Sequence, residues 1–170
     1  MLERIREAYL ARYDEIADII TREIGAPRKL SHAWQVALGK RHLEETLRTV
    51  ERFQWQRKKG TTLVTHEPVG VAALITPWNW PINQIVCKVA PALAAGCAMV
   101  LKPSEVSPMN AVLFAEIMDE AGVPRGVFNL VKAMGRPSGP HSARIRTSTW
   151  CRLPDRRARA SRLRSWPRRP

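Results

Sequence analysis

Residues 69–81 place an apolar run directly before a turn flanked by prolines. The apolar part, 71–75, has the length and composition of a buried strand. The run breaks at a Thr-Pro pair, and Pro81 stands where a helix tolerates proline, because the first N–H group of a helix has no intrahelical partner. The stretch therefore predicts a strand, a tight turn and a helix, with Asn79 at the mouth of that helix.

Asn79 has two interpretations. The start of a helix presents unpaired N–H groups and the positive end of the helix dipole, so it favours a negative charge or a polarised oxygen. A side-chain amide at that place can donate to an oxyanion that develops during a reaction. Asn is also a favoured residue for capping a helix, and the pattern alone leaves both roles open.

The rest of the central region alternates between strands and helices. We expect a strand at 61–67, a helix at 81–95, a strand at 98–101, a helix with Ser107 as its N-cap, and a strand at 127–131. Short connections between such elements favour parallel strands with right-handed crossovers. The expected fold class is α/β: N-terminal helices followed by a partial Rossmann-like parallel sheet (βαβαβ), with ligands at the carboxyl ends of its strands.

The first sixty residues predict helices. Apolar residues at helical spacing predict one amphipathic helix over about 5–24, ended by a glycine and a proline. A second helix is expected from Ser31, and the basic run 57–59 is interpreted as a helix C-terminus facing water. The aromatic side chains of this part are expected in the core: Tyr9, Tyr13, Trp34 and Phe53.

Charge divides the chain. Residues 1–133 hold 17 Lys or Arg against 14 Asp or Glu, whereas residues 134–170 hold 11 Arg against one Asp. The tail also lacks an apolar period, so its composition predicts disorder. We therefore expect a helical part at 1–60, a partial nucleotide-binding α/β unit at 61–133 and a disordered basic tail at 134–170.

The cysteines and the apolar stretches narrow the class of protein. Cys87, Cys97 and Cys151 show no regular spacing, which argues against a disulfide framework and against a metal site. This usage favours a reducing, cytoplasmic location. The most apolar stretch, 85–101, contains a lysine, a proline and a glycine, so we expect no membrane span. The balanced body also makes nucleic acid an unexpected partner.

Residues 75–81, Ile-Thr-Pro-Trp-Asn-Trp-Pro, closely resemble the signature turn of the aldehyde dehydrogenase superfamily. Two further blocks, 88–105 and 120–131, resemble the same family in the same order and with the same spacing. No G-x-G-x-x-G follows the first strand, and the family also lacks that fingerprint there. The resemblance covers about 1–131 and then stops.

The resemblance implies an NAD(P)-dependent oxidoreductase that converts an aldehyde to a carboxylic acid through a thiohemiacetal and a thioester. In the family, the residue matching Asn79 holds the oxyanion, and those matching Lys102 and Glu105 contact the adenosine ribose of the cofactor. Composition alone would make Lys102 and Glu105 solvated loop charges. A carboxylate at Glu105 should repel a 2′-phosphate, so NAD is preferred over NADP. The cofactor-binding candidates, of which Ser104 is a weaker one, are Ile75, Thr76, Pro77, Trp78, Asn79, Lys102, Ser104 and Glu105.

The family's reaction also needs a cysteine nucleophile, a glutamate that activates water and a second glycine-rich cofactor loop, all of which lie in later family sequence. The resemblance therefore implies an N-terminal cofactor-domain fragment, inactive by itself, from a homo-oligomeric family that takes a small-molecule aldehyde. Two alternatives stay open. One is a non-enzymatic binding protein whose basic arm binds nucleic acid, and the other is a product without a settled fold.

We hypothesise that the tail is translated out of frame. A GC-rich back-translation with one base restored near codon 132 gives a string that resembles the family's continuation, including its glycine-rich loop. Met134 and Trp150, which have a single codon each, both fit that string. A frameshift at this place accounts for the abrupt change in composition.

Overall fold

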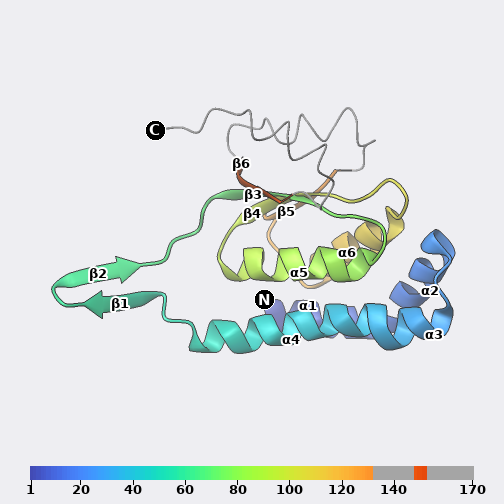
Figure 1. Ribbon diagram of the computed structural model, residues 1–170, viewed down its shortest axis with the longest axis horizontal. Helices are drawn as coiled ribbons and strands as arrows, with labels where there is room; N and C mark the ends of the chain where they lie inside the picture. The colour runs from blue at the N-terminus through green and yellow to red at the C-terminus, as the bar shows by residue number, and fades with distance from the viewer. Residues whose placement is uncertain (132–147, 153–170) are drawn as a thin grey trace.

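The computed structural model describes residues 1–131 and the backbone of residues 148–152. In chain order the elements are α1 (Leu2–Ala11), α2 (Tyr13–Ile24), α3 (Arg28–Leu30), the π-helical turn η1 (Ser31–Val36), α4 (Ala37–Arg52), β1 (Gln56–Lys59), β2 (Thr62–Thr65), β3 (Val71–Ile75), α5 (Pro81–Ala94), β4 (Ala98–Lys102), α6 (Met109–Glu120), β5 (Phe128–Leu130) and β6 (Ser148–Arg152). Figure 1 shows α5 and α6 packed against the sheet and the N-terminal helices lying further from it.

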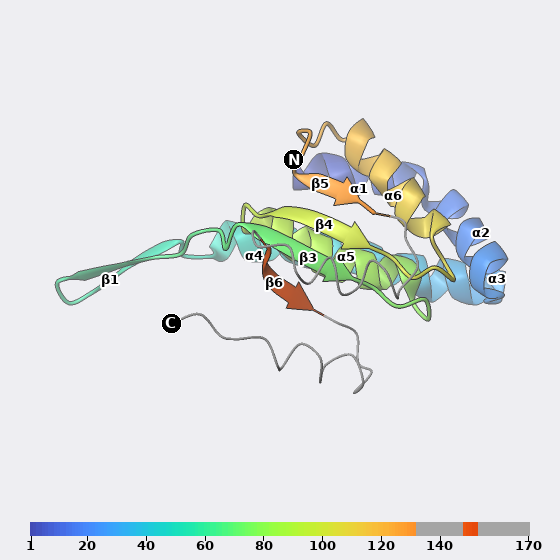
Figure 2. The same cartoon turned by 90° about the horizontal axis from the view of Figure 1, so that it is seen from above.

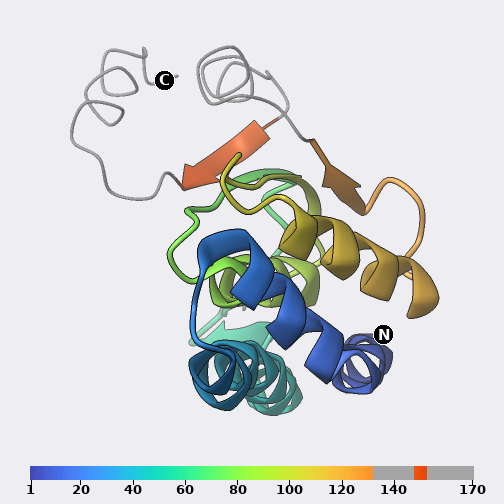
Figure 3. The ribbon, with the colours of Figure 1, turned by 90° about the vertical axis from the view of Figure 1, so that its right-hand side faces the viewer.

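The main sheet has the strand order β5-β4-β3-β6, and each of these pairings is parallel. Ile75 at the end of β3 lies opposite Lys102 at the end of β4. Both crossover helices, α5 and α6, cover the same face of the sheet (Figure 3). The expected βαβαβ unit is therefore confirmed, and the carboxyl ends of β3 and β4 share one edge of the sheet.

The core lies between the sheet and its helices. Leu74 and Leu101 point from neighbouring strands into it, and both are 0% exposed. They belong to one cluster with Ile85 of α5 and with Phe114 and Ile117 of α6. Burial of this apolar surface is the main force that holds the two crossover helices on the sheet.

The expected single helix over 5–24 is wrong in one respect, because it is broken at Arg12. The backbone there has φ −106° and ψ 21°, which ends α1 and lets α2 start in a new direction. The Arg12 guanidinium pairs with Glu116 at 2.8 Å and Glu120 at 3.0 Å, both on α6. The break between α1 and α2 therefore coincides with ion pairs to a helix that lies about a hundred residues later in the chain. Gly25 ends α2 in the left-handed conformation (φ 68°), as expected.

The second N-terminal helix differs more from expectation. It begins at Arg28 and passes through the π-helical turn η1 before α4. A π turn holds more residues than an α turn, so the side chains before it no longer follow the spacing of those after it. Trp34, inside η1, is 57% exposed. Phe53, the extended residue that follows α4, is 42% exposed. The expectation that both lie in the core is wrong.

Tyr9 does fill this core, with 0% of its surface exposed, whereas Tyr13 is half-buried and packs against the core from its edge. Its hydroxyl donates to the backbone oxygen of Val36 at 2.9 Å, at the end of η1. Gly39 lies against the same ring: a Cβ atom there would stand 2.2 Å from the Tyr9 hydroxyl oxygen. The close approach of α1 to α4 therefore depends on a missing side chain at position 39.

Residues 57–59 form part of β1 and do not belong to a helix, which corrects the interpretation of the basic run. β1 pairs antiparallel with β2, so that the strand expected at 61–67 is confirmed as one arm of a hairpin. The chain leaves α4 at Phe53 in an extended conformation, and the His66 N–H donates to the Trp55 carbonyl at 2.9 Å. Figure 2 shows this hairpin projecting from the body of the molecule.

The tail expected to be disordered contributes one described strand. β6 pairs in parallel with β3, with a register shift between Val71 and Ala72. Apart from 148–152, residues 134–170 lie outside the described residues, so the expected disorder of the tail stays a prediction. Within the part of the chain that the structure describes, no helix is long and apolar enough to cross a membrane.

Candidate functional site

The two segments singled out by the sequence meet at the carboxyl edge of the sheet. The turn after β3 carries Asn79, and the turn after β4 runs from Lys102 to Glu105. The two strands run in parallel next to each other, and the Thr76 N–H donates to the Lys102 carbonyl at 3.2 Å. Ligands of open α/β sheets bind at such an edge. The geometry therefore brings both halves of the expected site together.

Lys102 is not a solvated loop charge. Its side chain comes from the last residue of β4 and the residue is only 3% exposed. The ammonium pairs with the Glu105 carboxylate at 3.2 Å, while 52% of the Glu105 side chain is exposed. Because a buried ammonium needs a charged or polar partner, Glu105 holds the lysine charge at the border between the protein interior and solvent.

Ser104 lies between these two charges and shapes the turn. Its hydroxyl oxygen accepts a hydrogen bond from the Val106 N–H at 3.2 Å. The preceding Pro103 is buried. The turn from β4 to α6 is thus internally braced, and the Ser104 hydroxyl keeps its own hydrogen available for donation.

Asn79 does not cap α5. The residue at the N-cap position is Trp80, and no side chain makes a capping hydrogen bond there. Asn79 is exposed, and Pro81 occupies the start of the helix as predicted. Of the two interpretations of Asn79, the capping role is therefore absent in this structure, and the exposed residue lies two positions before the first residue of the helix.

The other predicted cofactor-binding residues line the same turn. Ile75 and Thr76 are 4% and 3% exposed, so mainly their backbone atoms border the edge of the sheet. Pro77 is half-buried, and Trp78 is 45% exposed. The turn therefore presents backbone atoms at the sheet edge, followed by two exposed residues, Trp78 and Asn79.

The sequence model of the aldehyde dehydrogenase family matches residues 1–144, which is most of the chain. The chain belongs to the aldehyde dehydrogenase family. The match extends past Val131, so the limit expected for the resemblance was set too early.

Curated aldehyde dehydrogenases that resemble the chain are much longer than it is. The 3-succinoylsemialdehyde-pyridine dehydrogenase of a Pseudomonas species is 52% identical over 136 residues, which are 79% of this chain and 28% of that protein. A putative aldehyde dehydrogenase of Staphylococcus haemolyticus is 47% identical over 82% of this chain and 29% of its own length. The chain therefore spans less than a third of the length of these relatives.

Solved aldehyde dehydrogenases share the fold. The enzyme of Bartonella henselae superposes with a TM-score of 0.92 at 38% identity, over 96% of this chain and 35% of that one. A mutant of aldehyde dehydrogenase C from Pseudomonas syringae, in complex with NAD+ and octanal, superposes with a TM-score of 0.87 at 44% identity, over 88% of this chain and 31% of that one. The arrangement of helices and parallel strands is thus that of the family.

A carboxylate that sequence reasoning missed lies at the start of α6, the helix that follows the Lys102–Glu105 turn. Glu23, near the end of α2, accepts hydrogen bonds from the backbone N–H groups of Met109 and Asn110 and from the Asn110 side chain, at the start of α6. The expected cap Ser107 does not make this contact; its hydroxyl is buried and has no hydrogen-bond partner among the described residues. Because Glu23 and Asn110 are 87 residues apart, no local sequence pattern could predict that Glu23 caps α6.

Two polar contacts of α5 were also missed, one with α4 and one within α5 itself. The His42 ring nitrogen Nε2 and the Asn83 side-chain oxygen lie 2.8 Å apart, at hydrogen-bond distance. The buried Lys88 donates to the Gln84 side-chain oxygen at 2.9 Å. Gln84 and Lys88 are four residues apart on α5, and that spacing was the available sequence signal for the second contact.

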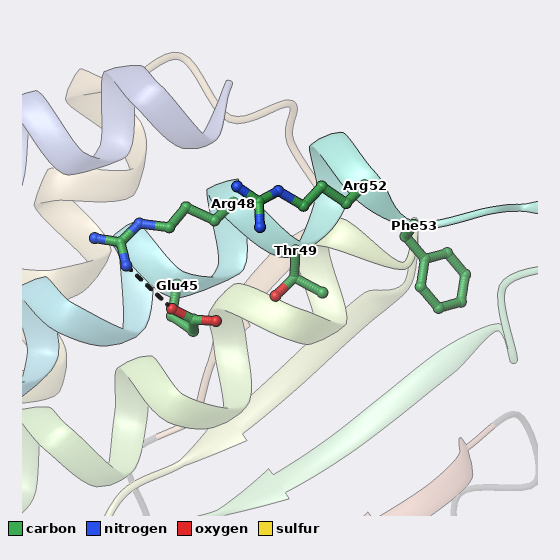
Figure 4. Close-up of a pocket in the computed structure, with 5 residues that line it drawn as sticks. All are labelled: Glu45, Arg48, Thr49, Arg52 and Phe53. Atoms are coloured by element: carbon green, nitrogen blue, oxygen red, sulfur yellow. Dashed lines mark hydrogen bonds and ion pairs between the residues drawn. The ribbon is translucent and has the colours of Figure 1, made fainter.

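A groove of about 660 Å³ lies elsewhere, along the C-terminal part of α4. Its lining residues are Glu45, Arg48, Thr49, Arg52 and Phe53. Figure 4 shows both arginines extending from the helix, with Arg48 paired to Glu45. Figure 1 places this end of α4 beside the hairpin, away from the connection between β3 and α5. The groove contains none of the predicted site residues, so the candidate site remains at the strand ends.

Proposed function

We propose that residues 1–131 form the oxyanion donor and the adenosine-binding part of an NAD-dependent aldehyde dehydrogenase, an enzyme that oxidises an aldehyde to a carboxylic acid. The supporting observation is the register of β3 and β4, in which Ile75 lies opposite Lys102. This register sets the Asn79 turn and the Lys102–Glu105 turn on one edge. The family and the fold agree with such a role.

The residues at this edge fit the adenosine end of a nicotinamide cofactor. Lys102 and Glu105 supply a donor and an acceptor 3.2 Å apart, which suits a ribose with two neighbouring hydroxyls. The Ser104 hydroxyl can donate a further hydrogen bond to the ribose, and residues 75–78 can pack against the ligand. When bound, the cofactor supplies the acceptor for a hydride. The carboxylate of Glu105 favours NAD over NADP, because it repels a 2′-phosphate.

Asn79 is proposed as the donor that stabilises negative charge on the aldehyde oxygen. Its amide is exposed and is not used as a cap of α5. A preorganised donor of this kind is worth on the order of 3 kcal/mol to a transition state. The substrate is a small-molecule aldehyde, and the protein is a cytoplasmic member of a homo-oligomeric family.

We further propose that the polypeptide of these 170 residues does not oxidise aldehydes by itself. Cys97 is buried, and Cys87 lies half-buried on α5 with its thiol directed at the Gln84 carbonyl, 3.5 Å away. Neither cysteine matches the position of the family nucleophile. The test is an assay with NAD+ and a set of aldehydes that follows NADH absorbance. Sustained turnover by the purified chain would overturn this part of the proposal.

The cofactor site is tested by titrating the purified chain with NAD+ and following its backbone amide resonances. We expect shifts at 75–79 and 102–105, with about tenfold weaker binding in Glu105→Gln and in Lys102→Met, because each loses a hydrogen bond to a charged group. Lys58→Met on the hairpin is the matched control and should bind like the unchanged chain. Shifts confined to other residues, or equal affinity in all variants, would refute the site.

The charge of the tail supports a second candidate, a binding protein with a basic arm for nucleic acid. Residues 134–170 carry 11 Arg and one Asp. Retention on immobilised DNA that falls steeply with salt would favour this candidate, because contacts to phosphates release counterions.

The frameshift hypothesis for the tail is tested by the gene. Sequencing of the DNA around codon 132 and downstream should reveal an aldehyde dehydrogenase continuation in another reading frame. If no such continuation exists in either shifted frame, the frameshift hypothesis is refuted.

A further inference from the structure

The start of α6 is held by a side chain from another helix. Glu23 lies at the penultimate position of α2, and its two carboxylate oxygens accept from the N–H groups of Met109 and Asn110, the latter at 3.2 Å. A third bond comes from the side-chain amide of Asn110. An anion at this end of a helix also interacts favourably with the helix dipole.

No residue close to α6 in sequence replaces this carboxylate within the described part of the chain. The N-cap position is Pro108, and it makes no side-chain capping bond. The Ser107 hydroxyl and the Asn110 side-chain oxygen are buried without hydrogen-bond partners among the described residues. The first N–H groups of a helix need acceptors from outside the helix, and here Glu23 provides them.

A short and stiff segment joins the start of α6 to the candidate ribose site. Residues 103–108 connect Lys102 with Met109. Pro103 and Pro108 fix two of the φ angles in this segment, and the Ser104 hydroxyl braces it by accepting from the Val106 N–H. A displacement at the start of α6 therefore passes into the turn that carries Glu105.

The other end of this segment is fixed by the sheet. Lys102 pairs in register with Ile75, and its carbonyl accepts from the Thr76 N–H at 3.2 Å. The ion pair between Lys102 and Glu105 thus joins a residue anchored in the sheet to a residue whose place depends on α6.

We propose that Glu23 is a positioning residue for the ribose site: by holding the start of α6, it sets the distance between the Lys102 ammonium and the Glu105 carboxylate. Glu23 itself does not touch the ligand. The inference rests on the proposed function, because it assumes that Lys102 and Glu105 bind the ribose. It assigns a binding role to a residue of the helical part, far from the site in sequence.

The test uses the full chain and adenosine 5′-monophosphate as the probe, followed through the amide resonances of residues 102–106. Glu23→Ala should weaken binding by about three- to tenfold, because loss of a cap destabilises the start of a helix by a free energy of that order. It should also speed amide hydrogen exchange at Glu105 and Val106 in the absence of ligand. Glu23→Gln keeps an acceptor oxygen and should recover part of the affinity.

Arg12→Gln is the matched control, because it removes the ion pairs of α6 with Glu116 and Glu120 and leaves the start of the helix capped. Its affinity for the probe should equal that of the unchanged chain. If Glu23→Ala binds as well as the unchanged chain, or if Arg12→Gln weakens binding equally, the positioning role is refuted and the cofactor site stands. If the unchanged chain does not bind the probe, the cofactor site and the positioning role both fall.

Discussion

The main sheet and the β1–β2 hairpin are both made of short strands, but different forces hold them. Four of the five residues of β3 are buried, whereas all four residues of β1 are exposed. β3 has a partner strand on each side, and β1 and β2 pair with each other. An isolated two-stranded hairpin is marginally stable in water. The sheet therefore depends on buried apolar surface, and the hairpin depends on its backbone ladder and on ring contacts.

The largest expected difference is between a buried leucine of the main sheet and an exposed leucine of the hairpin. Leu101→Ala in β4 removes a side chain that is 0% exposed and should lower the free energy of unfolding by about 2–5 kcal/mol. Leu63→Ala in β2, where the side chain is 57% exposed, should cost less than about 0.5 kcal/mol. Urea unfolding followed by circular dichroism measures both. Equal costs would contradict the distinction between the two regions.

A pair of glycines sharpens the same comparison. Gly39→Ala places a methyl group against the Tyr9 hydroxyl and should cost about 1–3 kcal/mol through overpacking. Gly60→Ala, in the hairpin turn, meets no atom within 4 Å but must adopt φ 61°, so its cost of about 1–2 kcal/mol is backbone strain. Gly39→Ala should lower the melting temperature of the whole chain. Gly60→Ala should speed amide exchange in the hairpin and leave exchange in the rest of the chain unchanged. Equally faster exchange throughout the chain would contradict this expectation.

Alkaline pH probes the helical core. Burial raises the pKa of Tyr9 well above its usual value of 10.0, and the nearby Tyr13 adds to this. Above pH 10 the unfolded chain loses the tyrosine proton while the folded chain keeps it, so the free energy of unfolding falls as pH rises. Tyr9→Phe should flatten this part of the pH profile and should itself cost about 1–2 kcal/mol for the lost bond to Val36. Titrated urea midpoints between pH 8 and about 11 measure the slope. If the free energy of unfolding falls with pH as steeply in Tyr9→Phe as in the unchanged chain, Tyr9 is not the group responsible.

The smallest global effect is expected from Phe53. Its ring contacts Trp55 and His66 edge-on, with centroid distances of 4.6 and 5.2 Å. Phe53→Ala should weaken the hairpin by about 1 kcal/mol or less per lost ring pair. Faster amide exchange at His66, with an unchanged melting temperature of the body, is the expected result. A lowered melting temperature would show that the hairpin and the body are coupled.

The strand-turn-helix unit could be predicted from the sequence almost to the residue, because its signals are local. The apolar run predicted β3, and the proline at position 81 predicted the start of α5. The short connections predicted parallel pairing of the strands. The site followed from the same logic, since carboxyl ends of adjacent parallel strands share an edge.

What sequence reasoning missed depends on contacts between distant segments. Arg12 sits at the break between α1 and α2 while it pairs with α6, and the π turn places Trp34 outside the α-helical spacing used to predict burial. Glu23 caps a helix that begins more than eighty residues later. No pattern within a window of twenty residues contains the contacts of Arg12 and Glu23 with α6. The helical part was therefore predicted less well than the α/β part.

The pairing of β6 with β3 has a consequence for the order of assembly during synthesis. The partners of β4 and β5 all lie within residues 71–130, but Val71 meets Ser148 only after that whole unit has been made. Pairings between distant segments form slowly, because loop closure must precede any gain from contact. As the chain leaves the ribosome, β3, β4 and β5 can assemble first, and β6 joins a template that already exists.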